Sequence, residues 1–126
     1  EFGIGIHGEP GVQRMKYMPS KELAKLMVDK IVEDLKLEKG AEIALAVQGT
    51  GGTPYMEKFL FYKDVRNYVD SLGLKVFVSW VGEFMTSLEM QGARVAILRV
   101  DEELKRLLTA PAQTIAIRVP PPNVVS

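Results

Sequence analysis

The stretch from Glu42 to Val81, EIALAVQGTGGTPYMEKFLFYKDVRNYVDSLGLKVFVSWV, decides the fold class of this chain. It opens with a short apolar run, residues 42–48, of the kind found in a largely buried strand. Residues 49–53 turn the chain, and a helix is expected from residue 54 to about residue 72. A second strand follows over residues 74–81. Strand, helix and strand in this order predict a parallel crossover unit.

Local signals define both ends of this helix. Pro54 suits the first helical position, because its missing N–H would have no partner there. Thr53 directly precedes it and can supply the capping oxygen. Gly73 provides the stop.

A longer helix is expected before this unit, over residues 21–37. Leu23, Met27 and Ile31 recur at a spacing of four, while the charged residues fall largely on the opposite side. Ser20 is placed to cap this helix.

Shorter elements flank the two helices. Residues 2–6 alternate large apolar side chains with glycine, which predicts a short strand with one bare face. Residues 94–100 and 114–119 are also expected to be strands, and residues 82–92 to contain a short helix. Asp101 is expected to cap another short helix, with acidic residues in its first turn.

Together these elements predict a two-layer α/β domain with a mixed sheet of about five strands and helices packed on one face. Residues 1–126 are expected to form this single domain, and the Pro-rich residues 120–126 an extended tail. A strand is expected almost directly after the first residue, Glu1, so the chain is expected to be a fragment or a processed half of something longer.

Composition excludes several classes of function. The 16 Lys and Arg residues balance 16 Asp and Glu residues without a basic cluster, which argues against nucleic-acid binding. The absence of cysteine excludes a disulfide framework, and a single histidine excludes a histidine-rich metal centre within one chain. No apolar run reaches the roughly 20 residues that span a bilayer. No membrane contact, no bound metal and a cytoplasmic location are therefore expected.

The single histidine, His7, lies where the glycine-alternating segment meets a Gly-Glu-Pro-Gly turn. Its imidazole can act as a nucleophile or base, although a lone histidine is more often a surface or structural residue. Glu9 likewise has a structural alternative, in which its carboxylate belongs to the turn and has no part in function. Both interpretations stay open on the residues alone.

Residues 49–54 follow a strand and open a helix, where backbone N–H groups favour an anion. Their glycine spacing matches neither a P-loop nor a dinucleotide fingerprint, so a tight turn is an equal alternative. Trp80, Met85 and Met90 are candidates for a ligand pocket or a subunit contact, with ordinary packing as the alternative. Glu83 and Glu89 have no acid/base partner at a recognisable spacing.

Four segments resemble the dihydroxyacetone kinase family, specifically the C-terminal half of its dihydroxyacetone-binding K subunit. In chain order they are GIGIHGEPG (Gly3 to Gly11), GGTPYMEKF (Gly51 to Phe59), WVGEFMTSLEM (Trp80 to Met90) and the VDEELKRLL and APAQT blocks (Val100 to Thr114). This resemblance covers nearly the whole chain, and its first and third segments are the most specific.

The resemblance implies that His7 is the catalytic residue and forms a covalent hemiaminal with the carbonyl carbon of dihydroxyacetone. It also implies that Gly8 and Glu9 shape the turn and belong, with His7, to the substrate-binding residues. A ketone accepts such an addition and glycerol does not. It further implies that the chain is the substrate-anchoring part of a kinase and is incomplete for catalysis by itself. No cofactor is expected in this chain. ATP with Mg²⁺, or ADP fed by a phosphotransferase system, is expected on a nucleotide-binding L subunit or domain, and further substrate contacts on the N-terminal half of the K subunit.

Two alternatives remain. Relatives of the family act as transcriptional co-activators, so the chain is also a candidate for a dihydroxyacetone-sensing module. The third interpretation is an oligomer-forming half whose histidine is idle, because isolated sheet fragments often expose apolar edges. A homo-oligomer, in the simplest case a dimer, is also expected for the leading interpretation.

Overall fold

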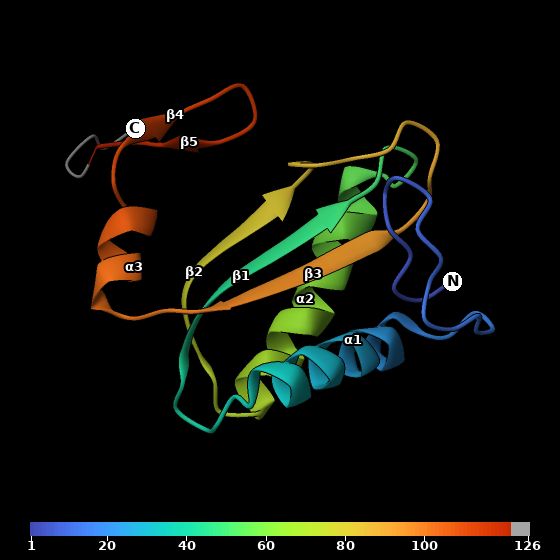
Figure 1. Ribbon diagram of the computed structural model, residues 1–126, viewed down its shortest axis with the longest axis horizontal. Coiled ribbons are helices and arrows are strands. Elements are labelled where there is room, and N and C mark those ends of the chain that lie inside the picture. Colours follow the sequence, from blue (N-terminus) through green and yellow to red (C-terminus); the bar gives the residue numbers. More distant parts are fainter. Residues whose placement is uncertain (122–126) are drawn as a thin grey trace.

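The structure is a computed structural model that describes residues 1–121. It contains three helices and five strands within that range (Figure 1). In chain order these are α1 (Ser20–Leu35), β1 (Glu42–Gly49), α2 (Tyr55–Ser71), β2 (Lys75–Gly82), β3 (Ala93–Arg99), α3 (Glu102–Leu108), β4 (Ala112–Gln113) and β5 (Arg118–Val119). The last five residues of the predicted tail, 122–126, lie outside the described residues.

The main sheet has the strand order β2-β1-β3. Strand β1 pairs in parallel with β2, which confirms the crossover unit predicted through α2. Strand β3 pairs with β1 in antiparallel register, Ala46 opposite Ala96, so the sheet is mixed as expected. The predicted set of about five strands is divided in two, because β4 and β5 form a separate antiparallel pair.

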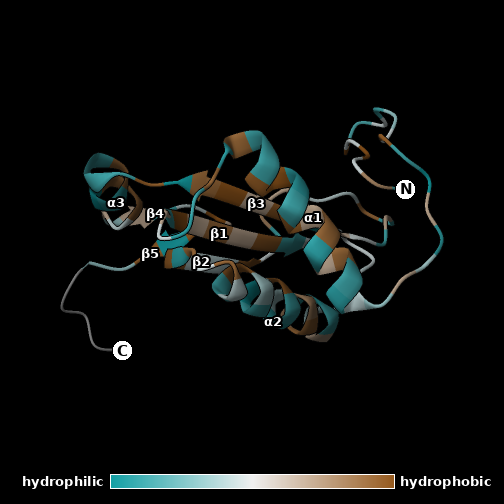
Figure 2. Cartoon of the chain, turned by 90° about the horizontal axis from the view of Figure 1, so that it is seen from below, coloured by the Kyte–Doolittle hydropathy of each residue, from teal (hydrophilic) through white to brown (hydrophobic). Residues whose placement is uncertain are grey.

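Helices α1 and α2 cover one face of the main sheet, which confirms the two-layer α/β class (Figure 1). Both helices carry a mixture of apolar and polar residues, and the strands of the main sheet are richer in apolar residues (Figure 2). The core between the layers is made of fully or nearly fully buried apolar side chains: Ala24, Val28, Leu37, Ile43, Leu45, Val47, Phe61, Val65, Val69 and Leu74. Burial of this surface, at about 25 cal/mol per Å², is the main force that holds the layers together.

Two strand predictions are wrong in detail. Residues 2–6 form no strand; Phe2 makes an isolated bridge with Gln13, and Gly3 takes a positive φ of 75° that breaks the extended backbone. The strand predicted over residues 114–119 is reduced to β5, since Thr114 turns the chain by accepting from the amide of Ile117 at 2.9 Å.

Two of the three predicted helix caps differ as well. Pro19 occupies the N-cap of α1, so Ser20 is already helical, and Pro54 occupies the N-cap of α2. The hydroxyl of Thr53 is used elsewhere, as described below. The third prediction is confirmed, because Asp101 Oδ1 accepts from the amide of Leu104 at 2.8 Å. The short helix predicted within residues 82–92 is absent from the described structure.

Candidate functional site

His7 lies in an exposed N-terminal turn. Its side chain is 80% exposed, and its Nδ1 lies 3.5 Å from Oε1 of Glu9. The other carboxylate oxygen of Glu9 accepts a hydrogen bond from the backbone N–H of His7 at 3.1 Å. The turn closes through Gly5, whose amide donates to the carbonyl of Glu9, and Gly8 carries a positive φ of 90°. The expectation that Gly8 and Glu9 shape the turn thus has a geometric basis: glycine permits the positive φ, and the carboxylate holds the histidine backbone.

Residues 1–18, which we call the N-terminal arm, project at one end of the described chain (Figure 2). Within residues 1–121, the hydrogen bonds and ion pairs of the arm join arm residues to one another, as between Phe2 and Gln13 or Glu1 and Gly11. The structure therefore presents His7 to solvent, and within the described residues no hydrogen bond or ion pair joins it to the sheet or the helices.

A second cluster lies at the carboxyl end of β1, where ligands usually bind in open parallel α/β sheets. The turn after β1 is covered by a segment that follows β2. The amides of Gly51 and Gly52 donate to the carbonyls of Ser87 and Met90 at 2.9 and 3.0 Å. Those amides are the groups that an anion would need, so the tight-turn interpretation of residues 49–54 is favoured over the anion site.

The two threonines of this turn complete the contact. Thr50 Oγ1 donates to the carbonyl of Met90, and Thr53 Oγ1 lies 2.8 Å from the Gly92 carbonyl and 2.9 Å from its amide. Thr53 therefore binds Gly92 instead of capping α2. A Cβ on Gly51 would lie 2.5 Å from the carbonyl oxygen of Leu88, which explains why only glycine fits there.

Beside this turn, α2 buries a lysine. The side chain of Lys58 is 1% exposed and its ammonium forms an ion pair with Glu83 Oε1. The ring of Tyr55 lies 4.0 Å from the same ammonium, a cation–π contact. The stem crosses Gly49 so closely that a Cβ there would lie 2.2 Å from Lys58 Cε. This pair joins α2 to the residue that directly follows β2.

Sequence reasoning missed this pair. No local spacing links Glu83 to its partner, because Lys58 lies 25 residues away and belongs to another element. One signal was present in the sequence: Lys58, Phe61, Val65 and Val69 share the buried face of α2, so a charge on that face required a partner.

The predicted pocket residues have a mixed outcome. Trp80 and Met85 line an apolar pocket of about 460 Å³ on the sheet face opposite α1 and α2, between the sheet and the α3 to β5 region. Met90 is absent from its lining and instead offers its carbonyl to the turn after β1. Lys105 of α3 donates to Glu42 of β1 and to Glu102, which fixes α3 beside the sheet.

Two structural features are absent from residues 1–121. No group of three or more His, Asp or Glu side chains is arranged to hold a metal ion, and no helix is long and apolar enough to cross a membrane.

Comparison with known proteins identifies relatives along most of the chain. It is 44% identical over 117 residues to the dihydroxyacetone-binding subunit DhaK of the PTS-dependent dihydroxyacetone kinase 1 of Listeria innocua, which covers 92% of this chain and 36% of the relative. Identity to the human triokinase/FMN cyclase is 33%, over 87% of this chain and 20% of that protein. The chain thus spans about a third or less of the curated relatives it matches.

A solved structure gives the same result for the fold. The dihydroxyacetone kinase operon co-activator Dha-DhaQ superposes with a TM-score of 0.80 at 32% identity, covering 86% of this chain and 34% of that protein. The family model described as the Dak1 domain matches residues 1–116, which include the arm, both helices of the core and every strand of the main sheet. On these grounds the chain belongs to the Dak1 domain family.

Proposed function

We propose that this chain captures dihydroxyacetone by covalent attachment to His7, as part of a dihydroxyacetone kinase. The observation that carries the proposal is the exposed imidazole beside a carboxylate in the GIHGEPG turn. The carboxylate of Glu9 lies near Nδ1 of His7 and therefore favours the imidazole tautomer that is protonated on Nδ1. In this tautomer the lone pair of Nε2 is free.

The chemistry is an addition to a ketone. Nε2 forms a bond to the carbonyl carbon, the C=O π electrons move to the oxygen, and that oxygen takes up a proton while the imidazole loses the one on Nδ1. Every atom of the ligand is retained, so the product is a hemiaminal with the full mass of dihydroxyacetone. A covalent anchor also fixes the orientation of the terminal hydroxyl for phosphoryl transfer.

The remaining parts of the kinase are assigned to other chain segments or subunits. Relatives about three times longer than this chain carry the kinase names, so phosphorylation is proposed for the complete protein. We place this chain in the C-terminal half of the dihydroxyacetone-binding subunit and the nucleotide, either ATP with Mg²⁺ or ADP fed by a phosphotransferase system, on an L-type partner. A cytoplasmic location and a homo-oligomer are part of the same proposal, and light scattering across a dilution series tests the oligomer.

Native mass spectrometry of the 126-residue chain tests the anchor. Excess dihydroxyacetone is expected to add its whole mass once, whereas glycerol and a His7→Ala variant are expected to give no adduct. An adduct of equal yield on His7→Ala would overturn the assignment.

A second function, ligand sensing without catalysis, is favoured by the likeness to the co-activator Dha-DhaQ. Both functions use the same anchor, so adduct formation does not separate them. Affinity purification of the complete protein does: a nucleotide-binding partner indicates a kinase, and a DNA-binding regulator in its place indicates a sensor.

A further inference from the structure

We infer that Glu9 makes the His7 anchor selective for uncharged hydroxyketones. The Glu9 carboxylate is fixed beside the imidazole and repels carbonyl compounds that carry a negative charge, including the phosphorylated product of a dihydroxyacetone kinase. The role of this selection in turnover rests on the proposed function, but the charge effect at His7 does not.

The first observation is that the Glu9 carboxylate is held in place. Its Oε2 accepts a hydrogen bond from the backbone N–H of His7 at 3.1 Å, and the backbone carbonyl of Glu9 accepts from the amide of Gly5 at 3.0 Å. The carboxylate lies so close over Gly5 that a Cβ on that residue would be 1.8 Å from Oε2. The negative charge therefore has one defined position relative to the imidazole, and a fixed charge acts on a ligand without first being reorganised.

The second observation is that no basic side chain neutralises this charge by contact. Within residues 1–121 the ion-pair partner of Glu9 is His7, whose Nδ1 lies 3.5 Å from Oε1, and neither carboxylate oxygen pairs with Lys or Arg. The nucleophilic form of His7 is the neutral imidazole. Glu9 thus carries an uncompensated negative charge at the moment when a carbonyl compound is attached.

Covalent attachment brings the ligand within range of that charge. The ligand carbon would be bonded to Nε2, on the side of the imidazole ring that lies away from Glu9. Two unit charges about 7 Å apart in water repel each other enough to change an equilibrium by about threefold. A phosphate monoester carries about 1.5 to 2 negative charges near pH 7, which raises the factor to about fivefold. The value for water applies because the side chains of His7 and Glu9 are 80% and 60% exposed.

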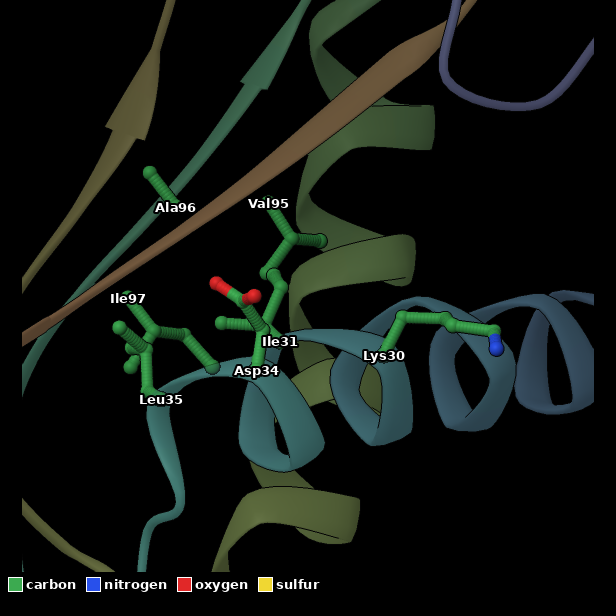
Figure 3. Close-up of a pocket in the computed structure, with 7 residues that line it drawn as sticks. All are labelled: Lys30, Ile31, Asp34, Leu35, Val95, Ala96 and Ile97. Atoms are coloured by element: carbon green, nitrogen blue, oxygen red, sulfur yellow. The ribbon is translucent and has the colours of Figure 1, made fainter. Parts of the chain in front are cut away.

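Two ligand-sized cavities of the described structure lie elsewhere. One is a groove of about 470 Å³ between α1 and β3 (Figure 3), and the other is the pocket of about 460 Å³ beside Trp80. Neither is lined by a residue of the N-terminal arm. Neither cavity encloses His7, so the local charge of the turn is the feature of the described residues that can distinguish one small carbonyl compound from another.

This charge favours the forward direction of the reaction proposed above. Dihydroxyacetone is uncharged, and transfer of a phosphoryl group to its terminal hydroxyl adds negative charge. On release, the bond between Nε2 and the ligand carbon breaks and its electron pair returns to the nitrogen. The ligand hydroxyl loses its proton as the C=O bond re-forms, and Nδ1 regains a proton. Repulsion from Glu9 therefore promotes release of the product more than release of the substrate.

Alkylation of His7 with two matched reagents measures the charge effect directly. With both reagents Nε2 displaces iodide from a CH₂ group, but iodoacetamide is neutral and iodoacetate is negatively charged. The chain has one histidine and no cysteine to compete, so peptide mass mapping follows His7 alone. We expect the ratio of the iodoacetamide rate to the iodoacetate rate to fall about threefold in Glu9→Gln. A changed tautomer of the imidazole alters both rates alike and cancels in this ratio.

Glu38→Gln is the matched control, because it removes the same charge beyond the other end of the 16-residue helix α1, which is about 24 Å long. Its rate ratio is expected to equal that of the natural chain. In 1 M salt, where the screening length is about 3 Å, the ratio in the natural chain should approach that of Glu9→Gln. This measurement needs no substitution in the turn. A ratio that is equal in the natural chain and in Glu9→Gln, or that does not respond to salt, would overturn the inference.

A comparison of two carbonyl ligands connects the charge effect to the proposed function. Hydroxypyruvate carries a carboxylate in place of one CH₂OH group of dihydroxyacetone. We expect Glu9→Gln to raise the adduct yield of hydroxypyruvate relative to dihydroxyacetone by about threefold in native mass spectrometry. An unchanged relative yield would contradict the inference. Absence of any dihydroxyacetone adduct, together with the expected alkylation ratios, would count against the proposed function alone.

Discussion

The ammonium group of Lys58 is paired with the carboxylate of Glu83 although the lysine side chain is 1% exposed. The two residues come from α2 and from the position directly after β2, so the pair ties the helix to the segment that covers the turn after β1. A buried cation without its partner is costly, whereas its replacement by an apolar side chain often is not. The two halves of the pair therefore differ in their contribution to stability.

Glu83→Gln is expected to lower the free energy of unfolding by about 2–4 kcal/mol, because it leaves the Lys58 ammonium buried without a counter-charge. Lys58→Met is expected to cost less, about 1 kcal/mol, since it keeps an unbranched apolar stem on the buried face of α2 and frees a carboxylate that can reach water. Urea unfolding followed through the fluorescence of Trp80, the single tryptophan, measures both. A larger loss for Lys58→Met would contradict this account of the pair.

Gly51→Ala is expected to destabilise the chain by about 1–3 kcal/mol, as overpacking against rigid backbone does. The added Cβ would lie 2.6 and 2.5 Å from the carbonyl oxygens of Ser87 and Leu88. Gly92→Ala is the matched control in the same cluster, because its Cβ would meet Thr50 Oγ1 at an ordinary 3.6 Å. Thermal unfolding of the two variants should therefore separate, and equal melting temperatures would show that the covering segment yields freely.

The sequence predicted the centre of this fold because its signals are local. A run of apolar residues, a glycine-rich turn and a helical period suffice to identify β1, α2 and β2, and the short crossover leaves one parallel arrangement. Asp101 was recognised as a cap for the same reason, since the bond to Leu104 spans three residues.

The predictions failed where an element depends on a distant partner. The alternation in residues 2–6 describes a segment able to form a strand, but a strand also needs a neighbouring strand, and within the described residues this segment makes only the isolated bridge between Phe2 and Gln13. Thr53 was predicted as a cap on local grounds and instead binds Gly92, 39 residues away. In the candidate site, the role proposed for His7 comes from its motif. The pairing of Lys58 with Glu83 left only an indirect trace in the sequence, a charge on an apolar helix face.

Glu9→Gln is expected to slow adduct formation with dihydroxyacetone by about threefold to tenfold, in line with the loss of a modest electrostatic contact. The amide oxygen of glutamine can still accept from the His7 backbone N–H, so the turn is retained, but the charge near Nδ1 is lost. The ¹⁵N shifts of the ring should show a smaller share of the Nδ1–H tautomer in the variant. An unchanged tautomer ratio with an unchanged rate would mean that Glu9 acts on the backbone of the turn only.

The attachment of α3 to the sheet is expected to depend on pH through Glu42. A hydrogen bond from Lys105 holds the pKa of the Glu42 carboxyl below its ordinary value of 4.5, and bonds to Glu102 and Glu42 raise that of Lys105 above 10.5. A lowered carboxyl pKa means that the contact contributes fully above pH 4.5 and is lost as the pH falls through the lower, folded value. The raised amine pKa means that the contact contributes fully below pH 10.5 and is lost as the pH rises through the higher, folded value.

Between these limits the contact between Lys105 and Glu42 should not change with pH. The NMR chemical shifts of the α3 amides, recorded from pH 7 to pH 2.5, measure its loss in acid. We expect the α3 amides to move less in the acid range in Glu42→Gln than in the natural chain, because the acidic residues of α3 itself are present in both proteins and only the contact of Glu42 with Lys105 is removed. The natural chain should also lose this contact at high salt, because both groups are near the surface and open to screening. Identical acid titrations of α3 in the two proteins would show that another group holds the helix against the sheet.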